Sequence, residues 1–358
     1  MTSDWHDDSS ATALIDRRNV LNPAERGNVM SSNTNTKFEY RTAESVSPRH
    51  PDKLCDRISD AILDACLMQD PNSRVAIEVM GGHGIITITG ELTTKAYVDM
   101  REIARRIAGD QYGVQVNVVK QSLEIAAGVD AGGAGDQGIM IGYACDETPE
   151  MLPLELVLSR RLNQFIYEKF PFDGKTQVTL QNSEIESIVA SFQNASKSEL
   201  ENLIKEWLGQ RALFNLDVKI FANPAGDWLK GGFEADTGLT GRKLVVDNYG
   251  PRISIGGGAF SGKDASKVDR SAAYMARRIA VDYLRDRQAK EVFVRLAYAI
   301  GIADPIEKSV IIDGVHEEVS DKYDLTPRGI IKKLELKKPI FEPTASYGHF
   351  GEGFIWDK

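Results

Sequence analysis

The chain has 358 residues, 42% of them hydrophobic and 27% charged, an ordinary composition for a globular protein with room for two or three domains. Its formal net charge of −9 predicts repulsion from nucleic acid and from anionic membranes, so neither is an expected partner. The three cysteines form no C-x-x-C pair and indicate neither a disulfide framework nor a zinc site, which favours a reducing cytoplasm.

Residues 1–37 are expected to form a disordered N-terminal extension. They are polar, rich in Ser, Asn and Asp, and contain no apolar segment of the kind that a signal peptide needs. Several acidic residues also argue against a transit peptide. The role of this extension is not readable from its composition.

The rest of the chain alternates strands and helices. An apolar series at helical spacing, from Leu54 to Ala65, predicts a helix with Asp56, Asp60 and Asp64 on another face, and Cys55 and Cys66 are expected to fill the core. The further predicted helices are 95–108, 152–169, 196–208, 269–286 and 327–336. The predicted strands are 74–79, 85–92, 176–181, 217–224, 243–249, 291–301 and 308–314. Strand pairs combined with helices predict an α+β fold.

A basic, glycine-rich stretch is the strongest local signal for function. Between residues 241 and 270 there are six basic and three acidic residues, a local charge of +3 around the glycine run 256–258. Glycines let backbone N–H groups approach a ligand, and lysines supply charge for phosphate oxygens, so the stretch predicts a polyphosphate site. Its spacing is neither that of a Walker A loop nor that of a Rossmann fingerprint. A glycine turn with surface lysines is the alternative.

Two shorter pieces add acidic and imidazole groups. His50, Asp52 and Lys53 directly precede the first predicted helix, and Asp52 suits Mg²⁺, which prefers a few carboxylates together with substrate phosphates. The alternatives are that Asp52 is a helix N-cap and that His50 is a surface histidine. Residues 126–144 are also rich in glycine, and there Asp136 could meet a metal or a cationic group, unless the stretch is a plain loop.

Two carboxylates fall within apolar strands. Glu78 lies between valines and isoleucines, and Glu91 ends the following strand. A buried carboxylate needs a cationic partner or it costs stability, so each predicts a bound cation or, alternatively, an inter-strand salt bridge.

Together these pieces resemble the methionine adenosyltransferase, or S-adenosylmethionine synthetase, family. The matching blocks occur in the family's order from about residue 39 to 351 and read "HPDKLCDRISDAILDA", "TGELTT", "GAGDQGIMIGYA", "GLTGRKLVVDNYG", "GGGAFSGKDASKVDRSAAYMAR", "YAIGIADP" and "ASYGHFG". The resemblance implies three similar α+β domains with pseudo-threefold symmetry, partly interleaved in sequence, at 38–125, 126–230 and 231–358. It also implies a homodimer with active sites at the subunit interface, possibly a homotetramer.

The reaction that the resemblance implies consumes ATP and L-methionine. The methionine sulfur attacks C5′ of ATP, and the expelled tripolyphosphate is then hydrolysed to diphosphate and phosphate, with two Mg²⁺ per site and K⁺. The catalytic residues implied are His50, Lys175, Arg242, Lys243, Lys263 and Lys267. The ATP-binding residues are His50, Asp136, Asp173, Lys175, Trp228, Asp236, Arg242, Lys243, Ala259 and Lys263. Methionine is assigned to Glu91, Gln121, Asp236 and Lys267, Mg²⁺ to Asp52 and Asp269, and K⁺ to Glu78.

Some positions depart from the family pattern. Arg49 replaces the usual glycine before His50, the loop between Gln121 and Asp136 is shorter, Asp227 stands where a basic residue is common, and Phe233 replaces a common proline. These changes leave open an enzyme for another methionine-like thioether or one that mainly hydrolyses tripolyphosphate. A non-catalytic regulatory homologue is a third interpretation, which the retained ionic residues disfavour.

Overall fold

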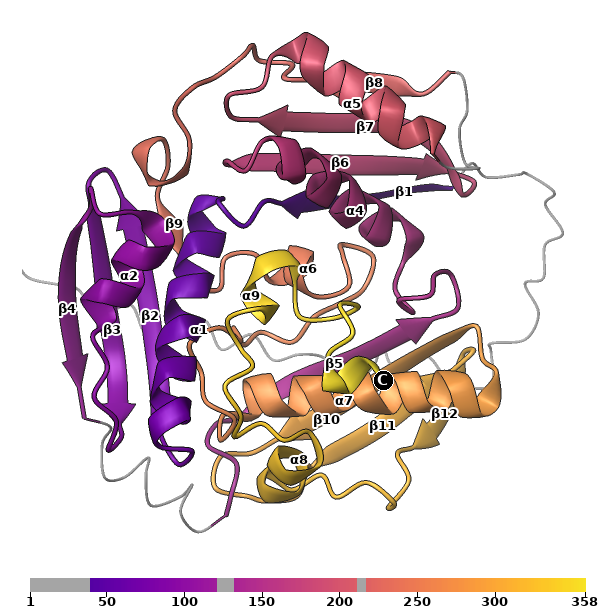
Figure 1. Cartoon of the computed structure of the whole chain (residues 1–358). Coiled ribbons are helices and arrows are strands. Elements are labelled where there is room, and N and C mark those ends of the chain that lie inside the picture. The colour runs from indigo at the N-terminus through magenta and orange to yellow at the C-terminus, as the bar shows by residue number, and fades with distance from the viewer. Residues whose placement is uncertain (1–38, 121–131, 211–216) are drawn as a thin grey trace, which may run out of the picture. The chain divides into compact units, whose positions relative to one another are not determined.

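The computed structural model describes residues 39–120, 132–210 and 217–358. A long helix followed by an antiparallel hairpin occurs three times in this part of the chain (Figure 1). The first set is α1 (Pro51–Gln69), β2 (Arg74–Gly82) and β3 (Ile85–Thr93). The second is α4 (Leu154–Lys169), β6 (Gly174–Gln181) and β7 (Glu184–Phe192). The third is α7 (Val268–Arg287), β10 (Glu291–Tyr298) and β11 (Glu307–Ile312).

Each hairpin gains a strand from a different part of the chain. On one side an antiparallel strand is added, namely β9 (Gly238–Leu239) on β2, β1 (Tyr40–Val46) on β6, and β5 (Gly138–Cys145) on β10. On the other side β4 (Gly113–Val119) and β8 (Lys219–Ala222) pair in parallel, and β12 (Val315–Glu318) pairs antiparallel. The result is three four-stranded sheets, which confirms the predicted α+β fold of similar, interleaved sheet-and-helix domains. The threefold symmetry and the exact domain limits stay predictions.

Helices cover one face of each sheet. In β2 the side chains of Val75, Ile77 and Val79 are buried against α1, whereas Glu78 and Met80 are exposed on the opposite face. The remaining helical segments are α2 (Met100–Ala108), α5 (Lys197–Gly209), α6 (Leu244–Asp247), α8 (Pro327–Lys333) and α9 (Thr344–Tyr347), with short 3₁₀ turns at Gly232–Glu234 and Ile355–Asp357. Figure 1 shows α6 and α9 between α1, α4 and α7. In the described part of the chain no helix has the length and apolarity that a membrane span requires.

Several predicted elements need correction. The predicted strand 243–249 is wrong, because residues 244–247 form α6. The valines there favour an extended chain, but the buried guanidinium of Arg160 binds the carbonyl oxygens of Val246 and Asn248 and holds the turn closed. The predicted helix 95–108 begins only at Met100, because the Asp99 side chain caps it.

The structure also contains strands that the sequence reading did not predict. These are β1, β4, β5, β7, β9 and β12, and β5 begins at Gly138 within the stretch that could have been a plain glycine-rich loop. Residues 126–131 of that stretch lie outside the described residues. Cys55 and Cys66 are buried in the core as free thiols, as predicted.

Candidate active site

The first helix begins at a histidine. His50 is the N-cap of α1, and its Nδ1 accepts a hydrogen bond from the backbone N–H of Asp52 at 3.2 Å. Pro51 follows at the first helical position, where its missing N–H costs nothing. Asp52 therefore lies in the first turn, so the N-cap interpretation of Asp52 is wrong. His50 is 7% exposed, so it is not a surface histidine.

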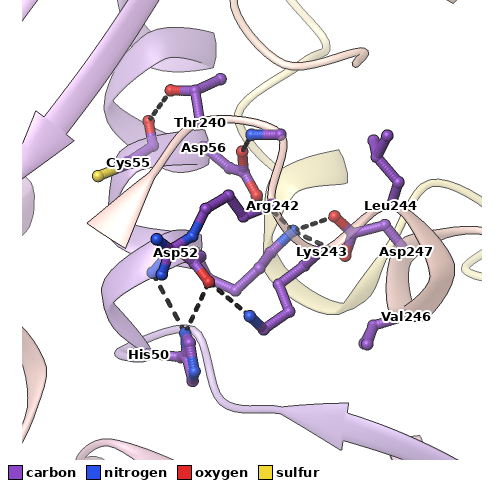
Figure 2. Close-up of polar contacts among 12 residues, drawn as sticks. His50, Asp52, Cys55, Asp56, Thr240, Arg242, Lys243, Leu244, Val246 and Asp247 are labelled. Carbon is purple, nitrogen blue, oxygen red and sulfur yellow. Dashed lines mark hydrogen bonds and ion pairs between the residues drawn. The ribbon is translucent and has the colours of Figure 1, made fainter. Parts of the chain in front are cut away.

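Asp52 is the centre of a cluster of charged groups. Its Oδ1 accepts the Leu239 N–H at 3.0 Å and Arg242 Nε at 2.8 Å, and its Oδ2 accepts Lys243 Nζ at 2.5 Å. Figure 2 shows the side chains of His50, Arg242 and Lys243 around this carboxylate. Burial by itself would raise the pKa of Asp52, but the hydrogen bonds from Lys243 and Leu239 outweigh it and lower the pKa.

The same surroundings keep His50 neutral. Burial, followed by the nearby charge of Lys243, lowers the pKa of His50 to about 3, although Asp52 opposes the shift. Because Nδ1 accepts a hydrogen bond, the proton of the neutral ring is on Nε2. The ring thus offers a hydrogen-bond donor on the side away from Asp52.

Four carboxylates spaced four residues apart bind α1 to the C-terminal third of the chain. Each accepts backbone N–H groups from a different segment, Asp52 from Leu239, Asp56 from Gly241, Asp60 from Gly262, and Asp64 from Phe341 and Glu342. The sequence placed three of these carboxylates on one helix face but gave no partner for them. Their regular spacing was the signal that could have identified a second buried face.

A fully buried ion pair lies beneath this helix face. Lys53 Nζ is 2.8 Å from both oxygens of Asp247 and 3.1 Å from Oδ2 of Asp56. Burial alone would lower the pKa of Lys53, but the charges of Asp247 and Asp56 outweigh it and raise the pKa. Because Asp247 ends α6, this pair fixes the segment that begins with Arg242 and Lys243 against α1.

Further predicted site residues lie beside His50. The Oδ2 of Asp173 accepts the Gly232 N–H at 2.9 Å, and burial raises the pKa of this carboxyl to about 6. Trp228 is its neighbour, since a Cβ built on Gly231 would lie within 2.9 Å of both residues. Lys175 is half-exposed and 3.5 Å from Glu44, and Asp236 is exposed. The charges of Lys175 and Asp236 both act on the pKa of His50, which places them near it.

The second half of the basic stretch forms a separate cluster before α7. Lys263 Nζ donates to Asp269 Oδ2 at 2.6 Å, and Lys267 Nζ donates to Asp264 Oδ2 at 2.5 Å. Gly258 is required there, because a Cβ at this position would lie 2.2 Å from the Asp269 carboxyl carbon. Ala259 touches Gly241, where a Cβ would lie 2.6 Å from its methyl group.

The predicted carboxylates of the first sheet face outward. Glu91 lies opposite Ala76, and Ala76 pairs in turn with Lys263, so Glu91 and Lys263 belong to one row across the sheet. Glu78 is exposed on the same face, so burial does not force a partner on it. Within the described residues neither glutamate forms a salt bridge, contrary to the inter-strand alternative.

Two predicted residues, Asp136 and Gln121, belong to neither cluster. Asp136 is half-buried and accepts the N–H of Gln137 at 2.8 Å, and Gln121 lies outside the described residues. The structure therefore gathers His50, Asp52, Asp173, Lys175, Trp228, Asp236, Arg242 and Lys243 in one group, here called the His50 group. It gathers Lys263, Lys267, Asp269 and Ala259 in a second, the Asp269 group. In the described part of the chain no hydrogen bond or ion pair joins the two.

The available carboxylate oxygens fit a metal ion that a bound ligand also coordinates. Among the described residues no group of three or more His, Cys, Asp or Glu side chains could hold a metal by itself. Within the described residues Asp52 Oδ2 accepts a hydrogen bond only from Lys243, and Asp269 Oδ1 accepts none. Both carboxylates therefore keep oxygen lone pairs that could bind Mg²⁺. For K⁺ the fit fails, since Glu78 offers a single exposed carboxylate and no cage.

Three departures from the family pattern have local explanations, whereas residues 121–131 of the shorter loop lie outside the described residues. The guanidinium of Arg49 binds the carbonyl oxygen of Ile107 at 3.0 Å, at the end of α2, where a cation is favoured. Phe233 is fully buried, with its ring edge-on to Tyr112. Asp227 accepts the N–H of Lys197 at 2.8 Å, at the start of α5.

Fold and site together define a three-sheet α+β protein with carboxylate–cation clusters at the starts of two of its long helices. Three family models match the chain, the N-terminal domain of S-adenosylmethionine synthetase at residues 39–125, its central domain at 131–228 and its C-terminal domain at 230–358.

Curated relatives agree with these matches. The S-adenosylmethionine synthase of Treponema denticola is 43% identical over 90% of this chain and 96% of its own. Those of Brachyspira hyodysenteriae and Salinibacter ruber are 42% and 41% identical, over 89% and 88% of this chain and 95% of each relative. The chain therefore belongs to the S-adenosylmethionine synthetase family, a family of transferases.

Proposed function

We propose that this chain forms S-adenosylmethionine, phosphate and diphosphate from ATP, L-methionine and water. The sulfur of methionine would attack C5′ of ATP and expel tripolyphosphate, which is then hydrolysed. The observation that supports this most directly is the Asp52 carboxylate, whose two oxygens hold Arg242 and Lys243 beside a neutral His50.

The leaving group explains why so many cations are gathered. A thioether is a neutral, weak nucleophile, so the reaction depends on neutralising the charge of the departing triphosphate and on alignment. Arg242 and Lys243 already approach each other at Asp52, although like charges repel, and an incoming polyanion could exchange with that carboxylate. Lys175, Lys263 and Lys267 would add charge along the phosphates.

His50 would act as a hydrogen-bond donor. With Nδ1 occupied by the Asp52 N–H, the Nε2–H of the neutral ring is free to donate to the oxygen that bridges the ribose and the triphosphate. This role needs no change of protonation state near neutral pH.

The two ends of ATP and methionine would be held by groups around these cations. Trp228 would stack on adenine, with Asp136, Asp173 and Ala259 at nucleotide contacts and Asp236 near the methionine ammonium group. Glu91, Gln121 and Lys267 would hold methionine. Asp52 and Asp269 would hold Mg²⁺, which supplies charge neutralisation on the phosphates when bound. K⁺ at Glu78 has no structural support and remains an ion to be tested.

A homodimer, possibly assembled into a tetramer, is part of the proposal. The outward face of the first sheet exposes Met80, Ile85 and Val119 next to Glu78, an apolar surface that a second chain could cover. Within the described residues no hydrogen bond or ion pair joins the His50 and Asp269 groups, and a site made from both chains would bring them together. We also propose a cytoplasmic location, since all three cysteines are free thiols.

The test is mass spectrometry of the purified protein with ATP, methionine and Mg²⁺, with and without K⁺. S-adenosylmethionine together with diphosphate and phosphate is expected, and EDTA should abolish it. Phosphate release without the sulfonium product would instead indicate a tripolyphosphatase or an enzyme for another thioether, which methionine analogues would then identify. No product with any thioether would leave the regulatory interpretation.

A further inference from the structure

A cavity outside both groups lies next to the segment that leads to Lys267. It has a volume of about 250 Å³ and is bounded by the end of α1, residues 71–74, residues 132–133, residues 264–266, α8 and residues 336–337. Much of its lining is apolar, contributed by Leu67, Pro71, Ala265, Pro327, Ile331 and Leu336. The volume is slightly below the roughly 300–1,000 Å³ of drug-sized pockets, so it suits a small metabolite.

The charged lining of this cavity is mainly basic. Arg328 and Lys337 line it together with Arg74, which already has a partner, and with Asp264, in a chain whose net charge is −9. Asp264 is already neutralised by Lys267. Lys337 donates to the uncharged side chain of Asn72 at 2.6 Å and forms no ion pair within the described residues. An anionic group is therefore favoured beside an apolar one.

Ser266 supplies an independent sign of a ligand. It lines the cavity, is 5% exposed, and its hydroxyl oxygen is buried beside the Asp264 carboxylate without a hydrogen bond of normal geometry in the described part of the chain. Buried hydroxyl groups are nearly always hydrogen-bonded, so a ligand atom or water belongs beside it. A water would satisfy the hydroxyl but would not account for the apolar walls or the basic groups.

The cavity is connected to a candidate catalytic group through one residue. Asp264 lines the cavity and accepts Lys267 Nζ at 2.5 Å, the Ser266 N–H at 2.9 Å and the Val75 N–H at 2.7 Å. A ligand that bonds to Ser266 thus contacts the residue that lies between Asp264 and Lys267 in sequence. Its presence would change where the Lys267 ammonium group is held.

We propose that this cavity is a regulatory pocket for a small monoanion with an apolar body, bound by Arg328, Lys337 and Ser266. The effect on catalysis depends on the proposed function, because it acts through Lys267. The binding itself does not.

The first experiment measures binding by calorimetry on the full chain, without ATP or methionine. The probes are benzoate, benzyl alcohol as its uncharged counterpart, and inorganic phosphate as an anion without an apolar body. Benzoate is expected to bind saturably, at least about tenfold more tightly than benzyl alcohol, since a charge-assisted contact contributes about that factor. Equal binding of the two, or no saturable benzoate binding, overturns the pocket.

Matched variants locate the site. Arg328→Glu/Lys337→Glu should weaken benzoate binding at least about tenfold. Lys332→Glu/Lys333→Glu makes the same charge change at exposed positions of α8 outside the cavity and should bind benzoate as wild type does. Equal losses in both double variants would mean a non-specific surface effect. Ser266→Ala should weaken binding without altering charge, and unchanged affinity would remove its hydroxyl from the site.

The second experiment follows S-adenosylmethionine formation while benzoate is added. A benzoate-dependent rate is expected in wild type and in Lys332→Glu/Lys333→Glu, and its loss is expected in Arg328→Glu/Lys337→Glu, with basal rates similar in all three. An unchanged rate at saturating benzoate would overturn the regulatory role. If no S-adenosylmethionine forms at all, the proposed function fails, and the binding experiment still decides the pocket.

Discussion

The buried ion pair between Asp60 and Arg270 tests how α1 holds the loop of the Asp269 group. Arg270 Nη1 and Nη2 donate to the two oxygens of Asp60 at 2.6 and 2.9 Å, and both side chains are fully buried. The same carboxylate accepts the Gly262 N–H at 2.8 Å, next to Lys263. Asp60→Asn keeps the shape but removes the charge and turns an N–H group toward the guanidinium.

Removing one partner of a buried pair costs about 3–5 kcal/mol, because the other charge is left uncompensated. Arg270 keeps hydrogen bonds to Tyr274, Thr344 and the Lys263 carbonyl, so the loss should be near the lower limit, about 3 kcal/mol. An exposed pair contributes only about 0–1 kcal/mol.

The assay is urea unfolding followed by tryptophan fluorescence, with Glu335→Gln as the control. Glu335 pairs with Lys338 at 2.5 Å, but both side chains are more than half exposed, so its loss should barely move the midpoint. Asp60→Leu/Arg270→Met should recover much of the stability, since apolar replacement of both partners is often neutral. A free energy of unfolding for Asp60→Asn within about 1 kcal/mol of the wild-type value would refute the claim that this buried pair stabilises the fold.

Three further outcomes follow from the described contacts. Lys267→Met should raise the barrier to S-adenosylmethionine formation by roughly 3–4 kcal/mol. It should also destabilise the fold by about 3 kcal/mol, because the buried Asp264 carboxylate loses its ion partner and keeps two backbone N–H donors. Asp173→Asn should stabilise the protein more at pH 7 than at pH 4.5. Burial raises the pKa of Asp173 to about 6. Ionisation of this carboxyl therefore lowers the free energy of unfolding as the pH rises from about 4 to about 6. Trp356→Ala should lower the free energy of unfolding by about 3–5 kcal/mol, since its ring is fully buried and stacks on Tyr274 at 3.8 Å.

Each of these has a control or a contradicting result. Lys332→Met changes an exposed lysine and should keep full activity, and normal turnover of Lys267→Met would contradict its role. An equal effect of Asp173→Asn at both pH values in urea titrations would mean that its carboxyl titrates normally. Trp356→Phe should cost less than Trp356→Ala, since the phenyl ring keeps part of the packing and loses the bond to the His349 carbonyl together with part of the ring volume.

The elements that the sequence predicted well are those with a strong local signal. Helix α1 and strands β2 and β3 follow from apolar spacing that a single segment displays by itself. Helix α5 begins at a capping box formed by Ser196 and Glu199, which is also local information. Strand 243–249 failed because Arg160 and Lys53, distant in sequence, decide the conformation there.

The candidate site shows the same division. Residue types and motif spacing were enough to nominate His50, Asp52, Arg242 and Lys243, because polyphosphate chemistry requires cations and carboxylates in quantity. That Asp52 binds both cations, and that His50 is neutral, depends on burial and on distances that no local pattern specifies.

By itself, then, the sequence determined the family, through its motif blocks, and the α+β class, and it nominated candidate site residues. Only the tertiary structure decided that β1, β5 and β9 complete sheets built from other segments. It also decided that the acidic face of α1 is an internal binding surface rather than a solvated one. The physical reason is that a carboxylate and its backbone N–H partner, more than 180 residues apart for Asp56 and Gly241, meet only when the whole core has formed.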